Sequence, residues 1–111
     1  MNLSTDTTGS MAELMVNSNG LIHGCNKAFE RFFGYLSNDI LWKPVSMLLP
    51  ALERINLITG EEINPRLRFL MHIGHQFDVI GLGGIHLASQ IFINEVENLG
   101  QHYLRIIICP S

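Results

Sequence analysis

The sequence predicts an α+β fold in which one five-stranded antiparallel sheet carries short helices inserted between its second and third strands. Three observations support this fold. An Asn-Gly turn separates two short apolar segments near the start of the chain. Capped helical patterns occupy the middle of the chain, and three segments rich in Ile, Val and Phe follow from residue 75 onward. Helices packed on one face are the simplest way to cover such a sheet.

The composition indicates a single domain. The chain has 111 residues, enough for one hydrophobic core, and we expect a flexible lead-in over 1–10 before one domain over 11–111. Charged residues make up 15%, below the usual ~25%, which indicates that part of the surface is covered. The net charge of -3, with dispersed basic residues, argues against nucleic acid. With no signal peptide, apolar membrane span or disulfide framework evident, a cytoplasmic location and no membrane insertion are expected.

The first half of the chain predicts a hairpin and then a helix. Residues 12–17 and 21–25 form the hairpin around the Asn-Gly turn. Asn26 is a good N-cap, and Gly34 is placed to end the helix in the left-handed conformation. Between them the helical spacing puts three aromatic rings on one face, those of Phe29, Phe32 and Phe33.

Short helices are expected in the middle of the chain. Ser37 is predicted to cap a turn that runs through residue 41. Pro50 opens a helix that Gly60 would close. Asn64 and Pro65 cap a further helix up to residue 74, although this segment also suits a strand.

The closing segments predict three strands in a meander, over residues 75–82, 85–97 and 101–109, with Pro110 ending the pairing. Glycines and an Asn-Leu-Gly turn separate them. Side chains alternate between the two faces of a strand, so one set points toward the helices. This inner set is Val79, Leu87, Ile91, Leu104, Ile106 and Ile108.

The order of these elements, with their turn residues, resembles the PAS domain family over about residues 11–109. The matching segments are Asn19-Gly-Leu-Ile22, Asn26-Lys-Ala-Phe-Glu-Arg-Phe-Phe-Gly-Tyr35, Ser37-Asn-Asp-Ile-Leu41, Lys43-Pro44, Leu48-Leu-Pro50, Gly83-Gly84, Ile93-Asn-Glu-Val-Glu97 and Gly100-Gln-His-Tyr103. Two departures are Trp42, where a Gly is usual, and Cys109-Pro110-Ser111, where an acidic exit is usual. The second departure bears on whether a signal passes to a following helix.

The resemblance implies a sensory or protein-interaction module of a signalling protein, with no catalysis of its own. Such domains often hold a small molecule between the inner sheet face and the helices. A small, mainly apolar ligand is therefore expected in a pocket lined by Phe29, Phe33, Ile55, Phe69, Val79, Leu87, Leu104 and Ile106. A ligand-free interaction or dimerisation module is the alternative. A small enzyme using a His and a carboxylate is a weaker alternative, because no nucleophile–base motif is present.

No cofactor is expected, because the residues at the positions that two branches of the family use to bind a cofactor are unsuitable here. Val45 stands where photoactive flavin domains have their reactive Cys. The polar flavin contacts fall on Val79, Ser89 and Ile108, and each buried flavin group left unpaired would cost roughly 1–3 kcal/mol. Phe69 stands where haem oxygen sensors have an axial His. His72 lies three residues further on, which keeps a haem-binding gas sensor as a weaker alternative; no other metal scaffold is evident among the histidines.

The same alternation predicts an apolar patch on the outer sheet face. Tyr103, Ile107, Phe92 and Val96 all point outward on neighbouring strands. Contiguous apolar patches usually mark an interface. A homodimer or a partner signalling domain is therefore expected on this face, against the alternative of scattered exposed apolar residues.

Overall fold

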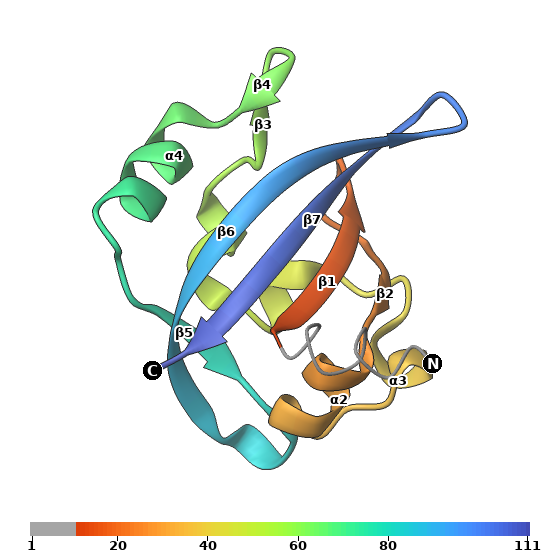
Figure 1. Cartoon of the computed structure of the whole chain (residues 1–111), viewed down its shortest axis with the longest axis vertical. Helices are drawn as coiled ribbons and strands as arrows, with labels where there is room; N and C mark the ends of the chain where they lie inside the picture. The colour runs from red at the N-terminus through yellow and green to blue at the C-terminus, as the bar shows by residue number, and fades with distance from the viewer. Residues whose placement is uncertain (1–10) are drawn as a thin grey trace, which may run out of the picture.

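A computed structural model describes residues 11–111, and the predicted five-stranded antiparallel sheet is present (Figure 1). Its strands are β1 (Ala12–Asn17), β2 (Ile22–Cys25), β5 (Phe77–Ile80), β6 (His86–Asn98) and β7 (Gln101–Pro110), in the spatial order β2-β1-β7-β6-β5. The helices lie between β2 and β5 in the chain, as predicted, and cover one face of the sheet. The lead-in expected over 1–10 lies outside the described residues.

Asn26 joins the first strand to the first described helix, α2 (Lys27–Phe33). Its side-chain oxygen accepts from the Phe29 amide at 2.9 Å, which is the predicted N-cap. The same oxygen accepts from the Glu13 amide at 3.0 Å, and the Asn26 amide group donates to the Met11 carbonyl at 2.9 Å. Gly34 ends α2 with a φ of 85°, as predicted. Asn26 therefore fixes the start of α2 against the start of β1.

Six short elements follow α2 before the sheet resumes. They are α3 (Ser37–Ile40), the 3₁₀ helices η1 (Val45–Met47) and η2 (Pro50–Arg54), the strands β3 (Ile58–Thr59) and β4 (Glu62–Ile63), and α4 (Pro65–His72). The prediction of one helix from Pro50 to Gly60 is wrong for the residues after η2. Ile55 is extended, and Gly60 lies with a φ of 68° in the turn that pairs β3 with β4.

The ends of α3 and α4 show which capping predictions hold. Ser37 does not cap α3, because Leu36 takes the N-cap position and the Asp39 carboxylate accepts from the Leu36 amide. α4 is a helix and not the alternative strand, since the Asn64 side chain accepts from the Arg66 amide at 2.9 Å.

Across residues 11–111, no helix has both the length and the apolar character needed to cross a membrane.

The last three strands form the predicted meander. β5 and β6 are joined through the short 3₁₀ turn η3 (Leu82–Gly84). The prediction that Pro110 ends the pairing is wrong, because it lies opposite Ser89 in the ladder. Proline has no N–H to donate, but the Ser111 amide donates to the Ala88 carbonyl at 3.0 Å, so the pairing continues past it.

The core lies between the helices and the inner face of the sheet. The buried apolar residues of the five-stranded sheet are Ala12, Leu14, Val16, Ile22, Phe77, Val79, Ile91, Ile93, Leu104, Ile106 and Ile108. Phe29 and Phe33 lie one helical turn apart on α2, and their rings meet at 4.8 Å between centroids. The expectation that Phe32 shares this face is wrong: it is 49% exposed, because a helix turns about 100° between neighbouring residues.

Trp42 has a backbone conformation that favours glycine, which is the usual residue at this position in the family that the chain resembles. Its φ is 65°, in the left-handed region that side chains with a Cβ disfavour by about 1–2 kcal/mol. Its amide donates to the Ile22 carbonyl at 2.6 Å, and its ring packs on His23 with centroids 4.4 Å apart. The indole contact therefore offsets part of the cost of the backbone conformation.

Candidate functional site

The side chains predicted to line an inner pocket are mostly fully buried in the core. Five of them are Phe29, Phe33, Val79, Leu104 and Ile106, all members of one buried cluster. Ile55 and Leu87 are partly buried against that cluster. These seven side chains come from α2, β5, β6, β7 and the segment after η2, so the fold does bring them to one side of the sheet.

Phe69 does not belong to this set. Its side chain is 59% exposed, whereas Leu67 on the same helix is fully buried. Residues two apart on a helix point about 200° apart, so α4 cannot bury both. His72, the weaker haem candidate, is exposed at the end of α4. The other cofactor-aligned positions, Val45, Val79, Ser89 and Ile108, are buried, and the Ser89 hydroxyl donates to the Leu87 carbonyl at 3.2 Å.

A surface hollow of about 340 Å³ adjoins the core next to Ile55. Its apolar walls include Val45, Leu52 and Leu57, which are buried, while Ser46 and other polar residues form its rim. The hollow lies between the β1–β2 turn and the segment around η2, away from the middle of the predicted inner pocket.

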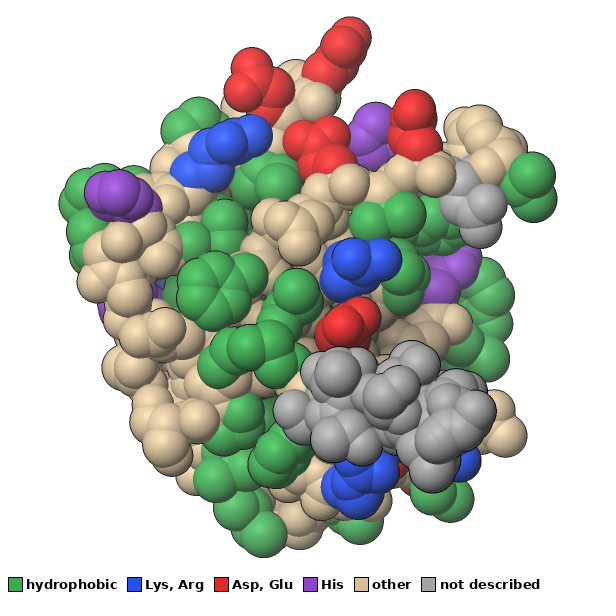
Figure 2. Space-filling view, viewed as in Figure 1, with side chains coloured by type: hydrophobic (Ala, Val, Ile, Leu, Met, Phe, Trp, Pro, Cys, Tyr) green, Lys and Arg blue, Asp and Glu red, His purple; other side chains and the backbone are tan. Residues whose placement is uncertain are grey.

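The outer sheet face carries the four side chains predicted for an interface, which we call the outer-face patch. Phe92 lies opposite Ile107 in the ladder, and Val96 lies opposite Tyr103. Phe92 is 41% exposed and the other three are half-buried. Figure 2, which views the molecule from the side of this face, shows hydrophobic side chains gathered across the middle of the sheet.

Two charged residues beside the outer-face patch were not singled out as site residues by sequence reasoning. Glu13 lies opposite Ile107 in the β1–β7 ladder. Arg105 Nε lies 3.6 Å from Glu13 Oε1, and this buried nitrogen has no hydrogen-bond partner among the described residues. The alternation along β1 could have placed Glu13 outward, but only the pairing of β1 with β7 places it beside Ile107.

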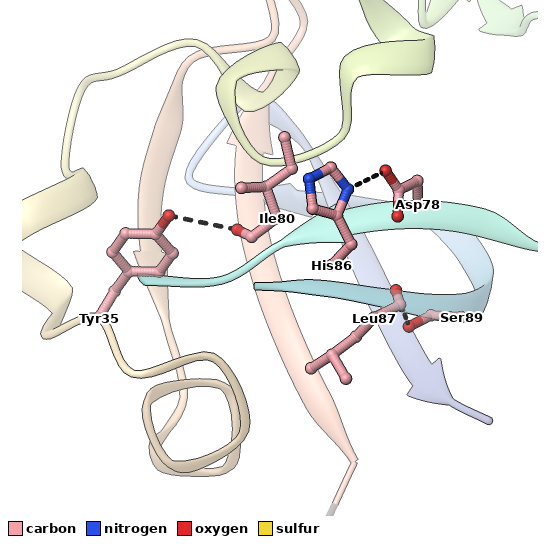
Figure 3. Close-up of polar contacts among 6 residues, drawn as sticks. All are labelled: Tyr35, Asp78, Ile80, His86, Leu87 and Ser89. Atoms are coloured by element: carbon pink, nitrogen blue, oxygen red, sulfur yellow. Dashed lines mark hydrogen bonds and ion pairs between the residues drawn. The ribbon is translucent and has the colours of Figure 1, made fainter. Parts of the chain in front are cut away.

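A histidine–carboxylate pair exists on the exposed side of β5 and β6, and no nucleophile from residues 11–111 forms a hydrogen bond with it. His86 Nδ1 lies 2.5 Å from Asp78 Oδ2 (Figure 3). Ser89 is three residues further along β6, points to the opposite face and is fully buried.

The thiol of Cys25 is half-buried. Burial raises the pKa of this thiol, a hydrogen bond with Ser37 lowers the pKa, and the charge of the Glu30 carboxylate raises it. A raised pKa disfavours the reactive thiolate.

A second histidine lies among carboxylates near the β6–β7 turn. His102 Nε2 lies 3.0 Å from Glu95 Oε1, and its Nδ1 lies 3.7 Å from Glu97 Oε2. Figure 2 shows acidic side chains gathered at this end of the molecule. Both ring nitrogens face carboxylates, an arrangement that suits the doubly protonated ring. Within residues 11–111, no group of three or more His, Cys, Asp and Glu side chains is arranged to hold a metal ion.

We expect His102 to titrate above the ordinary imidazole value. The hydrogen bond with Glu95 raises its pKa most, and Glu97 and Glu61 raise it further through their charge. Protonated His102 therefore stabilises the folded state fully below the ordinary pKa of about 6.5, and this stabilisation is lost as the pH rises through the raised pKa. An NMR titration of the ring should show a lower pKa in Glu95→Gln and no change in Glu62→Gln. An unchanged pKa in Glu95→Gln would contradict this assignment.

Comparison with known proteins identifies the fold. No protein-family model and no curated protein sequence matches this chain. A PAS domain from a two-component sensor histidine kinase is similar with a TM-score of 0.69 and 10% identity, covering 97% of this chain and 91% of that one. The PAS domain of nitrogen regulation protein NR(II) from Vibrio parahaemolyticus matches with a TM-score of 0.66 and 16% identity, covering 100% of both chains. The chain has the PAS fold.

The PAS fold is also shared with a dimeric photoreceptor. The light-state dimer of the fungal blue-light photoreceptor Vivid matches with a TM-score of 0.60 and 15% identity, covering 91% of this chain and 78% of that one. At such low identities the likeness extends to the fold and not to individual site residues. The predicted order of strands and helices, and the insertion of the helices after β2, are therefore confirmed.

Proposed function

We propose that this chain is a PAS-type sensory module of a signalling protein that acts through protein contact. In this proposal it carries out no catalysis of its own and holds neither flavin nor haem. The outer-face patch is the observation that carries the proposal, because two apolar cross-strand pairs lie on a sheet face that no described helix covers. The fold neighbours that are named as part of a sensor kinase and as a photoreceptor dimer support the same role.

A second copy of this chain is the occupant that we propose for the outer-face patch. The face carries one acidic and one basic residue, Glu13 and Arg105, beside the apolar pairs. In a two-fold symmetric contact every pairing occurs twice, so an approach of Glu13 of one copy to Arg105 of the other would be matched by the reverse pair. That contact would supply the hydrogen-bond acceptor that the buried Arg105 Nε lacks among the described residues.

Ile107→Glu tests the dimer. We expect the wild type to sediment as a dimer at high concentration and the variant to need at least about tenfold more protein to associate, since a buried unpaired carboxylate costs several kcal/mol. Ile73→Glu is the matched control, because Ile73 is an exposed isoleucine next to α4 and off the sheet. A wild type that stays monomeric at high concentration, with Ile107→Glu behaving identically, would contradict the proposal.

Binding of a small apolar ligand is the second candidate function. The convergence of Phe29, Phe33, Val79, Leu104 and Ile106 on one side of the sheet supports it, as does the hollow beside Ile55. The pocket stays a prediction, which native mass spectrometry of the purified protein tests by detecting a retained small molecule. Loss of that molecule in Phe33→Ala, with the fold retained, would place it at these side chains.

A further inference from the structure

A second apolar surface lies away from the outer-face patch, where the end of α2 meets the turn η3. A hollow of about 300 Å³ opens there. Its walls include Arg31, Phe32, Gly34, Leu82, Ile85 and Leu87, and we call it the α2–η3 hollow. Its two sides come from segments about fifty positions apart in the sequence.

The two sides of the α2–η3 hollow are joined by a hydrogen bond and approach closely at two glycines. The Tyr35 hydroxyl donates to the Ile80 carbonyl at 3.2 Å (Figure 3). A Cβ on Gly34 would lie 3.1 Å from the Leu82 Cβ, and a Cβ on Gly81 would lie 3.1 Å from the Phe33 carbonyl oxygen. A side chain at either position would crowd the opposite segment, and the φ of 85° at Gly34 also favours glycine. The hollow is therefore already formed before anything binds.

Large apolar side chains stand exposed around this preformed hollow. Leu82 is 55% exposed and Ile85 is 60% exposed, and Phe32 faces the same hollow from α2. The turn itself does not require them, because Gly83 and Gly84 supply its positive φ angles. Exposed apolar side chains gathered around one hollow are typical of a contact surface.

The charged side chain that lines the hollow is basic. Arg31 lines the hollow, and Lys27 lies four residues earlier on the same face of α2. Neither cation forms an ion pair with any residue of 11–111. The nearby carboxylates of Glu30 and Asp39 accept hydrogen bonds from backbone amides at 2.8 and 3.0 Å, at the start of α3. A ligand with free carboxylates would therefore find Arg31 available at the hollow and Lys27 one helical turn away.

We propose that the α2–η3 hollow docks a short acidic amphipathic segment of a partner protein. One large aliphatic side chain of the segment enters the hollow between Leu82 and Ile85, and a neighbouring carboxylate pairs with Arg31. The hollow is open and at the small end of the range of ligand pockets, about 300–1,000 Å³, which suits one anchoring side chain better than a whole enclosed ligand. This contact is separate from the dimer contact of the outer-face patch.

Two synthetic twelve-residue helical peptides test the proposal, one with Leu on one face and Glu elsewhere, the other with Lys in place of Glu. Titrated into the 15N-labelled protein, the Glu peptide should shift the amide signals of Arg31, Leu82 and Ile85. Its affinity should fall at least about tenfold in Arg31→Glu and in Leu82→Ser. The matched controls are Arg66→Glu and Ile73→Ser, exposed residues on and next to α4, which should bind it as the wild type does.

Each other result overturns the proposal. No signal shift at millimolar Glu peptide excludes docking, and equal binding of the Lys peptide excludes the acidic segment. Shifts confined to the outer-face patch would place the contact on the wrong face. Loss of self-association in Leu82→Ser, measured by sedimentation, would mean that a second copy fills the hollow. If Leu82→Ser alters the turn, the same measurements are made on Ile85→Ser, at a second exposed position in the wall of the hollow.

Discussion

Replacing Phe33 by alanine is expected to lower the free energy of unfolding by about 3–5 kcal/mol. The ring is only 2% exposed and lies 4.8 Å from the ring of Phe29, so its removal leaves a cavity beside the inner sheet face. Both rings belong to the same buried cluster as Val79 and Leu104, which limits how far the surroundings can close over the gap. Urea denaturation followed by circular dichroism measures the change.

Phe32→Ala is the matched control for this measurement. It removes the same ring one position earlier on the same helix, where the side chain is half exposed, and should change stability by less than about 1 kcal/mol. Equal effects of the two substitutions would show that α2 is rotated about its axis from the orientation described. That result would also remove Phe33 from any inner ligand pocket.

Asn26→Ala is expected to destabilise the protein by about 2–3 kcal/mol. The substitution removes the cap of α2 at the Phe29 amide and leaves two further backbone groups without partners, the Glu13 amide and the Met11 carbonyl. A cap at an ordinary helix start involves one amide and costs about 1 kcal/mol. The larger effect follows because this side chain joins β1 to α2.

Asn26→Asp separates these contributions. A carboxylate keeps the acceptor for both amides and loses only the donor to the Met11 carbonyl, so the cost should stay below about 1 kcal/mol. Asn64→Ala, at the N-cap of α4, offers the comparison with a cap at another helix. Thermal unfolding of the variants measures the order of effects, and an Asn26→Ala variant as stable as wild type would contradict this account.

The parts of the fold that sequence reasoning predicted are those specified by neighbouring residues. Asn26 and Gly34 marked both ends of α2, and Asn64 marked the start of α4. Period-two alternation placed Phe92 and Ile107 on the outer face and Ile106 on the inner one. Such signals need no knowledge of tertiary packing, because caps and alternation act within a few residues.

The parts that sequence reasoning missed depend on contacts between distant segments. The position of Glu13 beside Ile107 follows from the β1–β7 pairing, which no local pattern specifies. Phe69 suits either face of α4 by composition, and the packing of Leu67 decides the rotation of the helix. The Gly34–Leu82 contact likewise joins segments that sequence alone does not relate. Propensity is a weak guide wherever such tertiary contacts decide the outcome.

The pairing of β1 with β7 also affects how the chain folds during its synthesis on the ribosome. The pairing runs from Ala12 opposite Ile108 to Asn17 opposite Tyr103, so the central strand, β7, and its neighbour β1 are the last and the first of the five to be made. Until β7 has emerged, β1 has β2 as its only partner in the sheet and β6 has β5 as its only partner, and an isolated pair of strands is marginally stable at best. Pairings between such distant segments form slowly and leave apolar strands open to aggregation meanwhile. A chain that ended before Gln101 would therefore lack the strand that joins β1 to β6.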